Sequence, residues 1–327
     1  MKKYILTTLV LFYICLVSCG NLNRESKYKT TEEKQVAIEI PKFSADSAYR
    51  FVSEQVAFGP RVPESKAHVE CMEYLVNKLQ NYGAKTTVQD GSATLYNGKS
   101  ISVKNIIGEF RSEAKRRVLL MSHWDSRPFA DQERDAFLQK QPILGANDGA
   151  SGVGVLLEVA RLADSLPEDL GVDIVLFDVE DYGSPAWAGG GGGWCLGSEY
   201  WSKNPHKDGY RADFGILLDM VGAPNATFCQ EAYSLLYASK IVDKVWEEAM
   251  KSGFGGYFVS RRGGTIMDDH IPVNENRKIP SIDIIQYDPN SPTGFNTHWH
   301  TQKDDMGNID KNTLYAVGQT LLNVLCK

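Results

Sequence analysis

Apolar residues follow two periodicities along the chain, and each predicts a different element. Helical spacing is clearest between residues 63 and 83, where Pro63 and Glu64 open the pattern and Gly83 ends it. Three later stretches have similar spacing and predict helices over residues 149–166, 238–252 and 311–325. Between residues 63 and 83 the apolar positions recur at Val69, Met72, Leu75, Val76 and Leu79.

Short apolar runs between the predicted helices are typical of strands. Their length and their β-branched residues distinguish them from helices. Several lack polar alternation, so both faces of the sheet are expected to be covered. Strands that alternate with helices predict an α/β fold, a single domain over residues 40–327 with a mostly parallel, doubly wound central sheet flanked by helices. The predicted strands cover residues 101–110, 118–121, 172–177, 216–220 and 282–285.

The N-terminal segment has the features of a secretion signal. Residues 4–17 are apolar and follow two lysines, but this run is shorter than the ~20 residues that a membrane-spanning helix needs. The sequence Leu-Val-Ser-Cys at 16–19 resembles the lipobox of bacterial lipoproteins, which implies cleavage before Cys19 and a lipid on its sulfur. We therefore expect a signal peptide over 1–18 and a lipidated tether over 19–39. The expected location is the bacterial cell envelope, either facing the periplasm or in the outer membrane.

Composition and charge narrow the class of protein. With 43% hydrophobic and 23% charged residues among 327, the chain is typical of a globular protein rather than a disordered or coiled-coil one. The formal net charge of −6 argues against a nucleic-acid partner, because binding phosphates needs a basic surface. The six cysteines include no C-x-x-C pair that would indicate zinc or redox chemistry. We expect four of them to be buried thiols: Cys71, Cys195, Cys229 and Cys326.

Polar residues that can carry chemistry follow three of the predicted strands. His123 and Asp125 come after the first of these strands, and Glu180 and Asp181 come after the second. Asp219 lies near the end of the third. In open α/β sheets, ligands bind beyond the carboxyl ends of the strands. These side chains are therefore expected to meet in one crevice.

Two more residues, Asp148 at the start of a predicted helix and His300 in an aromatic loop, extend this set. Imidazole nitrogen and carboxylate oxygen bind zinc, and a catalytic zinc keeps one position open. Of the adjacent Glu180 and Asp181, one can bind metal while the other transfers protons. Taken singly, each residue also has an ordinary structural role open to it. Asp148 could cap a helix, and the acidic pair could lie in a solvated turn. Asp219 could accept hydrogen bonds from loop amides, and His300 could pack within its aromatic loop.

The order of these residues resembles that of a known group of enzymes. His-x-Asp at 123–125, Asn-Asp-Gly-Ala-Ser-Gly at 147–152, the acidic pair, Asp219 and His300 are similar to the zinc-dependent aminopeptidases with a parallel sheet. The resemblance covers residues 51–326 and implies their zinc aminopeptidase-like fold. Within that group, three later stretches resemble the glutaminyl-peptide cyclotransferases: Leu-Asp-Met-Val-Gly-Ala-Pro-Asn at 218–225, Asp-Asp-His-Ile-Pro at 268–272 and Trp-His-Thr at 299–301.

The resemblance implies a role for each matching position. It implies that Asp148, Asp181 and His300 hold one zinc ion and that Glu180 is the proton-shuttling acid. His123 and Asp219 match positions where the related aminopeptidases bind a second metal, so the binding of a second ion remains an alternative. The positions implied to lie beside the substrate are the acids Asp219 and Asp268, the aromatic walls Trp299 and Trp187, and His123.

Several positions depart from the animal cyclotransferases. Ser122 and Val153 stand where those enzymes form a disulfide, so that bridge is absent. Asp283 stands where they carry histidine, which favours a bacterial branch. Asp181 replaces the more usual glutamate ligand. Loop 183–201, with five consecutive glycines at 189–193, does not align with the family, and it contains Trp187.

The implied activity is zinc-dependent cyclisation of N-terminal glutamine to pyroglutamate, with release of ammonia. The expected partners are peptides or proteins with that N-terminus and, through the lipid anchor only, a membrane; the chain is expected to be a monomer. The alternative that shares these residues is a dinuclear zinc aminopeptidase in which Glu180 activates water. A lipid-anchored peptide-binding protein without catalysis is disfavoured, because no ligand is lost and Glu180 is present.

Overall fold

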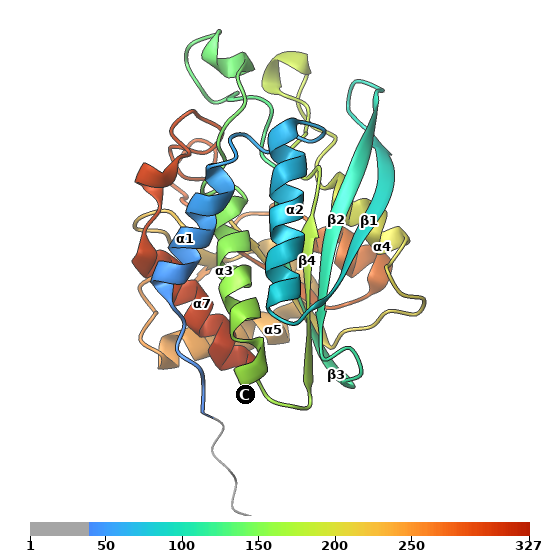
Figure 1. Ribbon diagram of the computed structural model, residues 1–327. Coiled ribbons are helices and arrows are strands. Elements are labelled where there is room, and N and C mark those ends of the chain that lie inside the picture. The colour runs from blue at the N-terminus through green and yellow to red at the C-terminus, as the bar shows by residue number, and fades with distance from the viewer. Residues whose placement is uncertain (1–38) are drawn as a thin grey trace, which may run out of the picture. The chain divides into compact units, whose positions relative to one another are not determined.

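A six-stranded sheet forms the centre of the protein, whose computed structural model describes residues 39–327 (Figure 1). Its strands are β1 (Lys85–Thr94), β2 (Ser100–Phe110), β3 (Arg116–His123), β4 (Leu170–Phe177), β5 (Phe214–Asp219) and β8 (Ser281–Ile285). They lie in the order β1-β2-β4-β3-β5-β8. Strands β4, β3, β5 and β8 run parallel to one another, while β1 and β2 form an antiparallel hairpin along one edge. The predicted α/β fold with a mostly parallel sheet is confirmed.

Strand β1 is the one strand of this sheet that the apolar pattern does not predict. Its residues Lys85–Thr94 are mostly polar, and exposed positions alternate with half-buried ones along it. An edge strand needs to bury only one face, and this one does so weakly, so it has no apolar run. Backbone pairing with β2, from Lys85 opposite Glu109 to Thr94 opposite Ser100, defines it instead.

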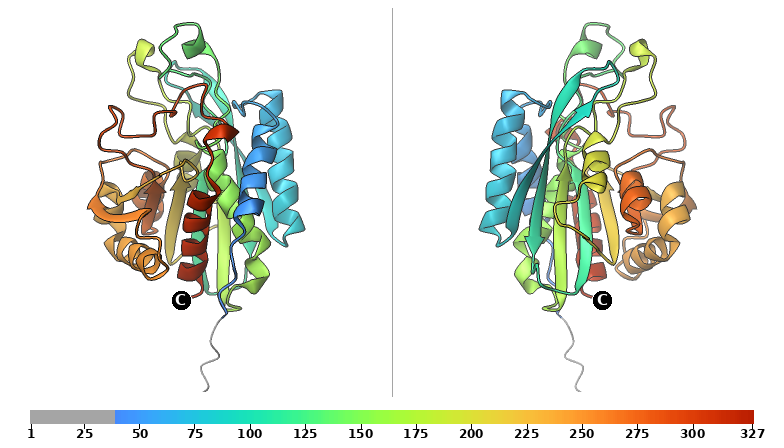
Figure 2. Two further views of the ribbon diagram at one scale, coloured as in Figure 1. Left: turned by 90° about the vertical axis from the view of Figure 1, so that its left-hand side faces the viewer. Right: turned by 90° about the vertical axis from the view of Figure 1, so that its right-hand side faces the viewer.

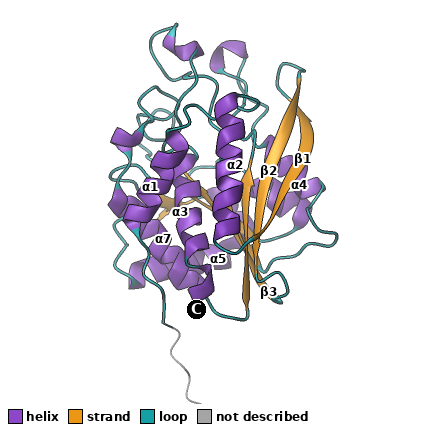
Figure 3. Ribbon diagram, in the orientation of Figure 1, coloured by secondary structure: helices purple, strands orange, loops and turns teal. Residues whose placement is uncertain are grey.

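Helices cover the sheet, and a small parallel pair of strands lies beside it (Figure 3). The pair consists of β6 (Phe228–Gln230) and β7 (Phe258–Arg262). The helices are α1 (Ala45–Val56), α2 (Lys66–Asn81), α3 (Ala150–Arg161), α4 (Leu196–Lys203), α5 (Ala232–Lys251), the short α6 (His270–Pro272) and α7 (Lys311–Leu325).

Alternate residues of the central strands enter two separate apolar cores. Leu120 of β3 and Ile174 of β4 belong to a large core shared with α1, α3 and α7, three helices that lie side by side on one face (Figure 2). Leu119 and Val175, one position along each strand, belong to a second core with Trp201 of α4. Both faces of the parallel strands are therefore buried, as their unbroken apolar runs predict.

Helix α5 begins earlier than the predicted residue 238. The carboxylate of Glu231 caps it by accepting hydrogen bonds from the amides of Tyr233 and Ser234, at 2.8 and 2.6 Å. The backbone is interrupted at Ala238, where φ is −146°. The apolar pattern therefore captured only the part of the helix that follows this break.

The four cysteines expected to be buried thiols are buried and unpaired, which confirms the prediction. Over residues 39–327 no helix combines the length and the apolarity needed to cross a membrane. The predicted signal peptide, Cys19 and the tether up to residue 38 lie outside the described residues.

Candidate active site

The carboxyl ends of the parallel strands place the candidate side chains at one edge of the sheet. Strand β3 ends at His123 and β5 ends at Asp219. Glu180 and Asp181 follow the end of β4, and all four residues are buried. The edge lies where the sequence predicts it, and burial excludes the solvated turn that the acidic pair could otherwise form.

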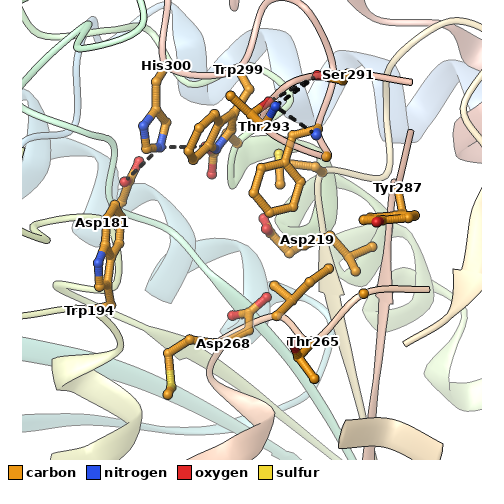
Figure 4. A pocket seen from close by; sticks show the side chains of 18 of the residues that line it. Asp181, Trp194, Asp219, Thr265, Asp268, Tyr287, Ser291, Thr293, Trp299 and His300 are labelled. Carbon is orange, nitrogen blue, oxygen red and sulfur yellow. Dashed lines mark hydrogen bonds and ion pairs between the residues drawn. The ribbon is translucent and has the colours of Figure 1, made fainter. Parts of the chain in front are cut away.

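Asp148, Asp181 and His300 come together as a group of metal-type donors. One ligand atom from each lies within 4.8 Å of the others. The Nε2 atom of His300 is 3.3 Å from Oδ1 of Asp181 (Figure 4). The same atom is 3.6 Å from Oδ2 of Asp148. The other carboxylate oxygen of Asp181 is buried without a hydrogen-bond partner. One imidazole nitrogen and two carboxylates, with an orphaned oxygen among them, fit a zinc ion.

Asp148 does not cap the helix that follows it. The N-cap of α3 is Gly149, and no side chain caps the N-terminus of this helix with a hydrogen bond. Position 149 requires glycine for a steric reason, because a Cβ there would lie 2.5 Å from the ring of His123. The carboxylate of Asp148 is therefore free of the structural role that its position suggests, and it faces the other donors.

A second group of donors shares Asp148 with the first. The Nε2 atom of His123 is 3.0 Å from Oδ1 of Asp148 and 3.1 Å from Oδ1 of Asp219. Asp125 fixes the backbone of the neighbouring acidic pair by accepting hydrogen bonds from the amides of Glu180 and Asp181, each at 3.2 Å. The set His123, Asp148 and Asp219 matches the second metal position that the sequence leaves open.

Glu180 lies in a buried, mainly acidic environment. The thiol of Cys195 is 3.4 Å from its Oε1 atom, and Asp268 contributes a carboxylate to the same cluster. Burial raises the pKa of Glu180 well above its ordinary value, with the charge of Asp268 adding to the rise and that of His123 opposing it. Burial likewise raises the pKa of Asp268 to about 7. A raised pKa favours the protonated form of a carboxyl group, which can then give its proton to a leaving group.

A cavity of about 570 Å³ opens beside these groups. Asp148, Glu180, Asp181, Asp219, Asp268 and His300 line one part of it. The remainder is largely apolar or aromatic, and Figure 4 shows Trp194, Trp299 and Tyr287 around it. His123 does not line the cavity, although its Nε2 atom contacts Asp148 and Asp219, which do.

The structure brings Trp194, and not Trp187, to the cavity. Trp187 is 47% exposed and packs edge-to-face on Phe129, with ring centroids 5.5 Å apart. Trp194 stacks on His300 instead, with centroids 5.9 Å apart. Both residues lie in the glycine-rich loop that does not align with the family. Only the folded path of that loop distinguishes them, so sequence reasoning missed Trp194.

The two tryptophans provide a matched test of this arrangement. We expect Trp194→Ala to lower kcat/KM for the cyclisation of N-terminal glutamine, the activity that the resemblance implies, about tenfold, the effect of losing ~1.4 kcal/mol of aromatic contact. Trp187→Ala is expected to stay within roughly twofold, because surface side chains outside a site contribute little. Steady-state kinetics on both purified variants measure the effect. Equal losses in the two variants would contradict the placement of Trp194.

Comparison with known proteins identifies the family. The model of the family described as peptidase family M28 matches residues 105–325. The chain belongs to peptidase family M28. This M28 protein is 52% identical to the glutaminyl cyclase of Bacteroides thetaiotaomicron, solved with N-acetylhistamine; the match covers 88% of this chain and 99% of that one, with a TM-score of 0.86.

Two other relatives of this M28 protein carry informative names. A solved Zn-dependent exopeptidase from Parabacteroides distasonis is 51% identical, covering 88% of this chain and 100% of that chain, with a TM-score of 0.87. The glutaminyl-peptide cyclotransferase of Gloydius blomhoffii is 28% identical over 303 residues, which are 80% of this chain and 75% of that protein. The resemblance to M28-type glutaminyl-peptide cyclotransferases is confirmed.

Proposed function

We propose that this protein is a zinc-dependent glutaminyl-peptide cyclotransferase that converts N-terminal glutamine to pyroglutamate and releases ammonia. The observation that carries the proposal is the 52% identity, over 88% of the chain, to a solved bacterial glutaminyl cyclase. The cavity agrees with it, because a buried donor group adjoins a pocket that contains further acids and two tryptophans.

Asp148, Asp181 and His300 are the residues that would hold the zinc. When bound there, the ion supplies positive charge for the oxyanion that develops on the side-chain amide of the substrate glutamine. The side chains of the protein must perform the other steps of the reaction. They must bind the terminal amine, move protons and hold the amine close to the amide carbon.

Glu180 is the group placed to move the protons. In the reaction, the α-nitrogen of the substrate forms a bond to its own side-chain amide carbon, and the C–N bond to the departing nitrogen breaks. Glu180 takes a proton from the attacking amine and gives one to the departing nitrogen, which leaves as ammonia. Its raised pKa suits both transfers.

Asp219 and Asp268 would act on the substrate amine and on Glu180. Both acids line the cavity, and Asp219 offers its carboxylate to the terminal ammonium before this group is deprotonated. Asp268 belongs to the same donor cluster as Glu180 and is one of the charges that raise its pKa. Trp299 and Phe295 lie with ring centroids 4.8 Å apart and form an apolar wall for the aliphatic part of the glutamine side chain.

A dinuclear aminopeptidase is the second candidate, and the group His123, Asp148 and Asp219 is the observation that favours it. The two activities give different products from the same reagents. We would incubate the purified protein with a glutamine-initiated peptide and with aminoacyl reporters. Ammonia release without peptide-bond cleavage supports the cyclotransferase, whereas release of free amino acids supports the aminopeptidase.

For the N-terminal segment we propose lipid attachment at Cys19 and anchoring of the domain to the bacterial cell envelope. The support is the lipobox-like sequence at 16–19. Cells fed a labelled fatty acid should label the wild-type protein and the Cys71→Ala variant, in which only a buried thiol is lost. The Cys19→Ala variant should carry no label. Label retained by that variant would exclude Cys19 as the attachment site.

A further inference from the structure

One arginine outside the predicted site contacts the metal-type donors directly. Arg127 follows β3, and its side chain is fully buried. One nitrogen of its guanidinium, Nη1, lies 3.3 Å from Oδ1 of Asp181 and donates to the backbone carbonyls of Asp181 and Gly183 at 3.2 and 3.3 Å. The arginine therefore fixes both the carboxylate of Asp181 and the backbone that carries it.

The other side of the guanidinium binds Asp131 in a bidentate pair. Nε and Nη2 of Arg127 donate to the two oxygens of Asp131 at 2.8 and 2.7 Å. Parallel bonds of this kind fix the relative orientation of the two groups as well as their distance. Asp131 is thereby immobilised, although it lies in a loop beyond β3.

Asp131 in turn fixes the orientation of the His300 ring. Its Oδ1 atom is 3.0 Å from Nδ1 of His300. A carboxylate at Nδ1 favours the tautomer that carries its hydrogen there, which leaves the Nε2 lone pair free for a metal. Nε2 of His300 is the atom that faces Asp148 and Asp181.

Aromatic rings isolate the arginine from water. The guanidinium carbon of Arg127 is 4.6 Å from the ring centroid of Trp194 and 5.8 Å from that of Phe129. Trp194 also stacks on His300. A charge buried in this way needs anionic partners, and Asp131 and Asp181 provide them. One divalent ion and Arg127 together would balance the charges of Asp131, Asp148 and Asp181.

We propose that Arg127 and Asp131 form a clamp that presets Asp181 and His300 for zinc and so increases the affinity of the site. Both are positioning residues, because each acts through a donor of the site. The clamp rests on the zinc site of the proposed function and not on the reaction performed there. Partners that orient metal ligands typically contribute 10–100-fold to metal affinity.

Zinc affinity of the full-length protein tests the clamp independently of activity. The Asp131→Asn variant keeps the shape of the side chain and loses its charge. The matched control is Asp173→Asn, since Asp173 forms a buried ion pair with Arg117 at 2.6 Å within the sheet and lines no part of the cavity. Competition between each apoprotein and a chelator, with zinc alone as the probe, gives the dissociation constants, and thermal unfolding reports whether each variant is folded.

We expect Asp131→Asn to weaken zinc binding 10–100-fold while Asp173→Asn stays within twofold of wild type. The more drastic Arg127→Met should weaken binding at least as much, and the absorption spectrum of the cobalt-loaded protein should change in both clamp variants. A loss under fivefold in Asp131→Asn, or an equal loss in the control, overturns the clamp. If zinc binds as expected but glutamine peptides are not cyclised, the proposed function fails and the clamp stands.

Discussion

Glu180→Gln is expected to retain the fold and the zinc while losing roughly 10²–10⁴-fold in turnover, the usual contribution of a positioned acid or base. Glutamine has the same shape as glutamate but cannot accept the proton of the attacking amine. Glu180 is not one of the three donors proposed to hold zinc, so metal content should stay unchanged. Ammonia release from a glutamine-initiated peptide measures turnover, and elemental analysis measures the metal.

The control for this substitution is Glu199→Gln. Glu199 lies on α4, its side chain is 49% exposed, and it pairs with Lys203 on the surface. Because surface ion pairs contribute little, this variant should match wild type in turnover and stability. Activity of Glu180→Gln within threefold of wild type would remove Glu180 from the proton role.

His300→Ala is expected to lose zinc and, with it, activity. This histidine supplies the only nitrogen donor of its group, and alanine leaves two carboxylates that lie close together. We expect zinc affinity to fall by more than the roughly 100-fold that loss of an outer partner can cause. Metal content after dialysis, followed by the ammonia assay, measures both effects.

His298→Ala is the matched control for His300→Ala. His298 lies in the same loop but belongs to none of the donor groups, so its variant should keep the metal. Full zinc occupancy in His300→Ala would place the ion elsewhere. Two ions per wild-type chain would indicate that the group containing His123 also binds metal.

The sequence predicts the parallel strands and the edge at which the acids meet, because both depend on local pattern. Strands β3, β4 and β5 are almost entirely buried and contain apolar runs, so their presence and the approximate position of their ends, within about two residues, can be found without a structure. Residues that follow such ends lie in the same place by the geometry of a parallel sheet. Glu180, Asp181 and Asp219 could therefore be expected together.

Contacts between loops could not be predicted in the same way. Arg127 and Asp131 are four residues apart, and nothing in their spacing indicates that Asp131 contacts His300, which lies far along the chain. Trp194 and Trp187 differ only in how the glycine-rich loop folds around them. Asp148 could equally have capped a helix, and only the path of the backbone at Gly149 excludes that role.

Asp148 offers one oxygen toward His300 and the other toward His123, so the two donor groups are not independent. A cation taken up between His123 and Asp219 would occupy the carboxylate proposed for the terminal ammonium of the substrate. High concentrations of free zinc should then compete with the peptide and inhibit the enzyme. On this scaffold, the occupant of Asp219 would therefore decide the reaction. A second metal ion bound there would favour hydrolysis, and the substrate amine bound there would favour ring closure.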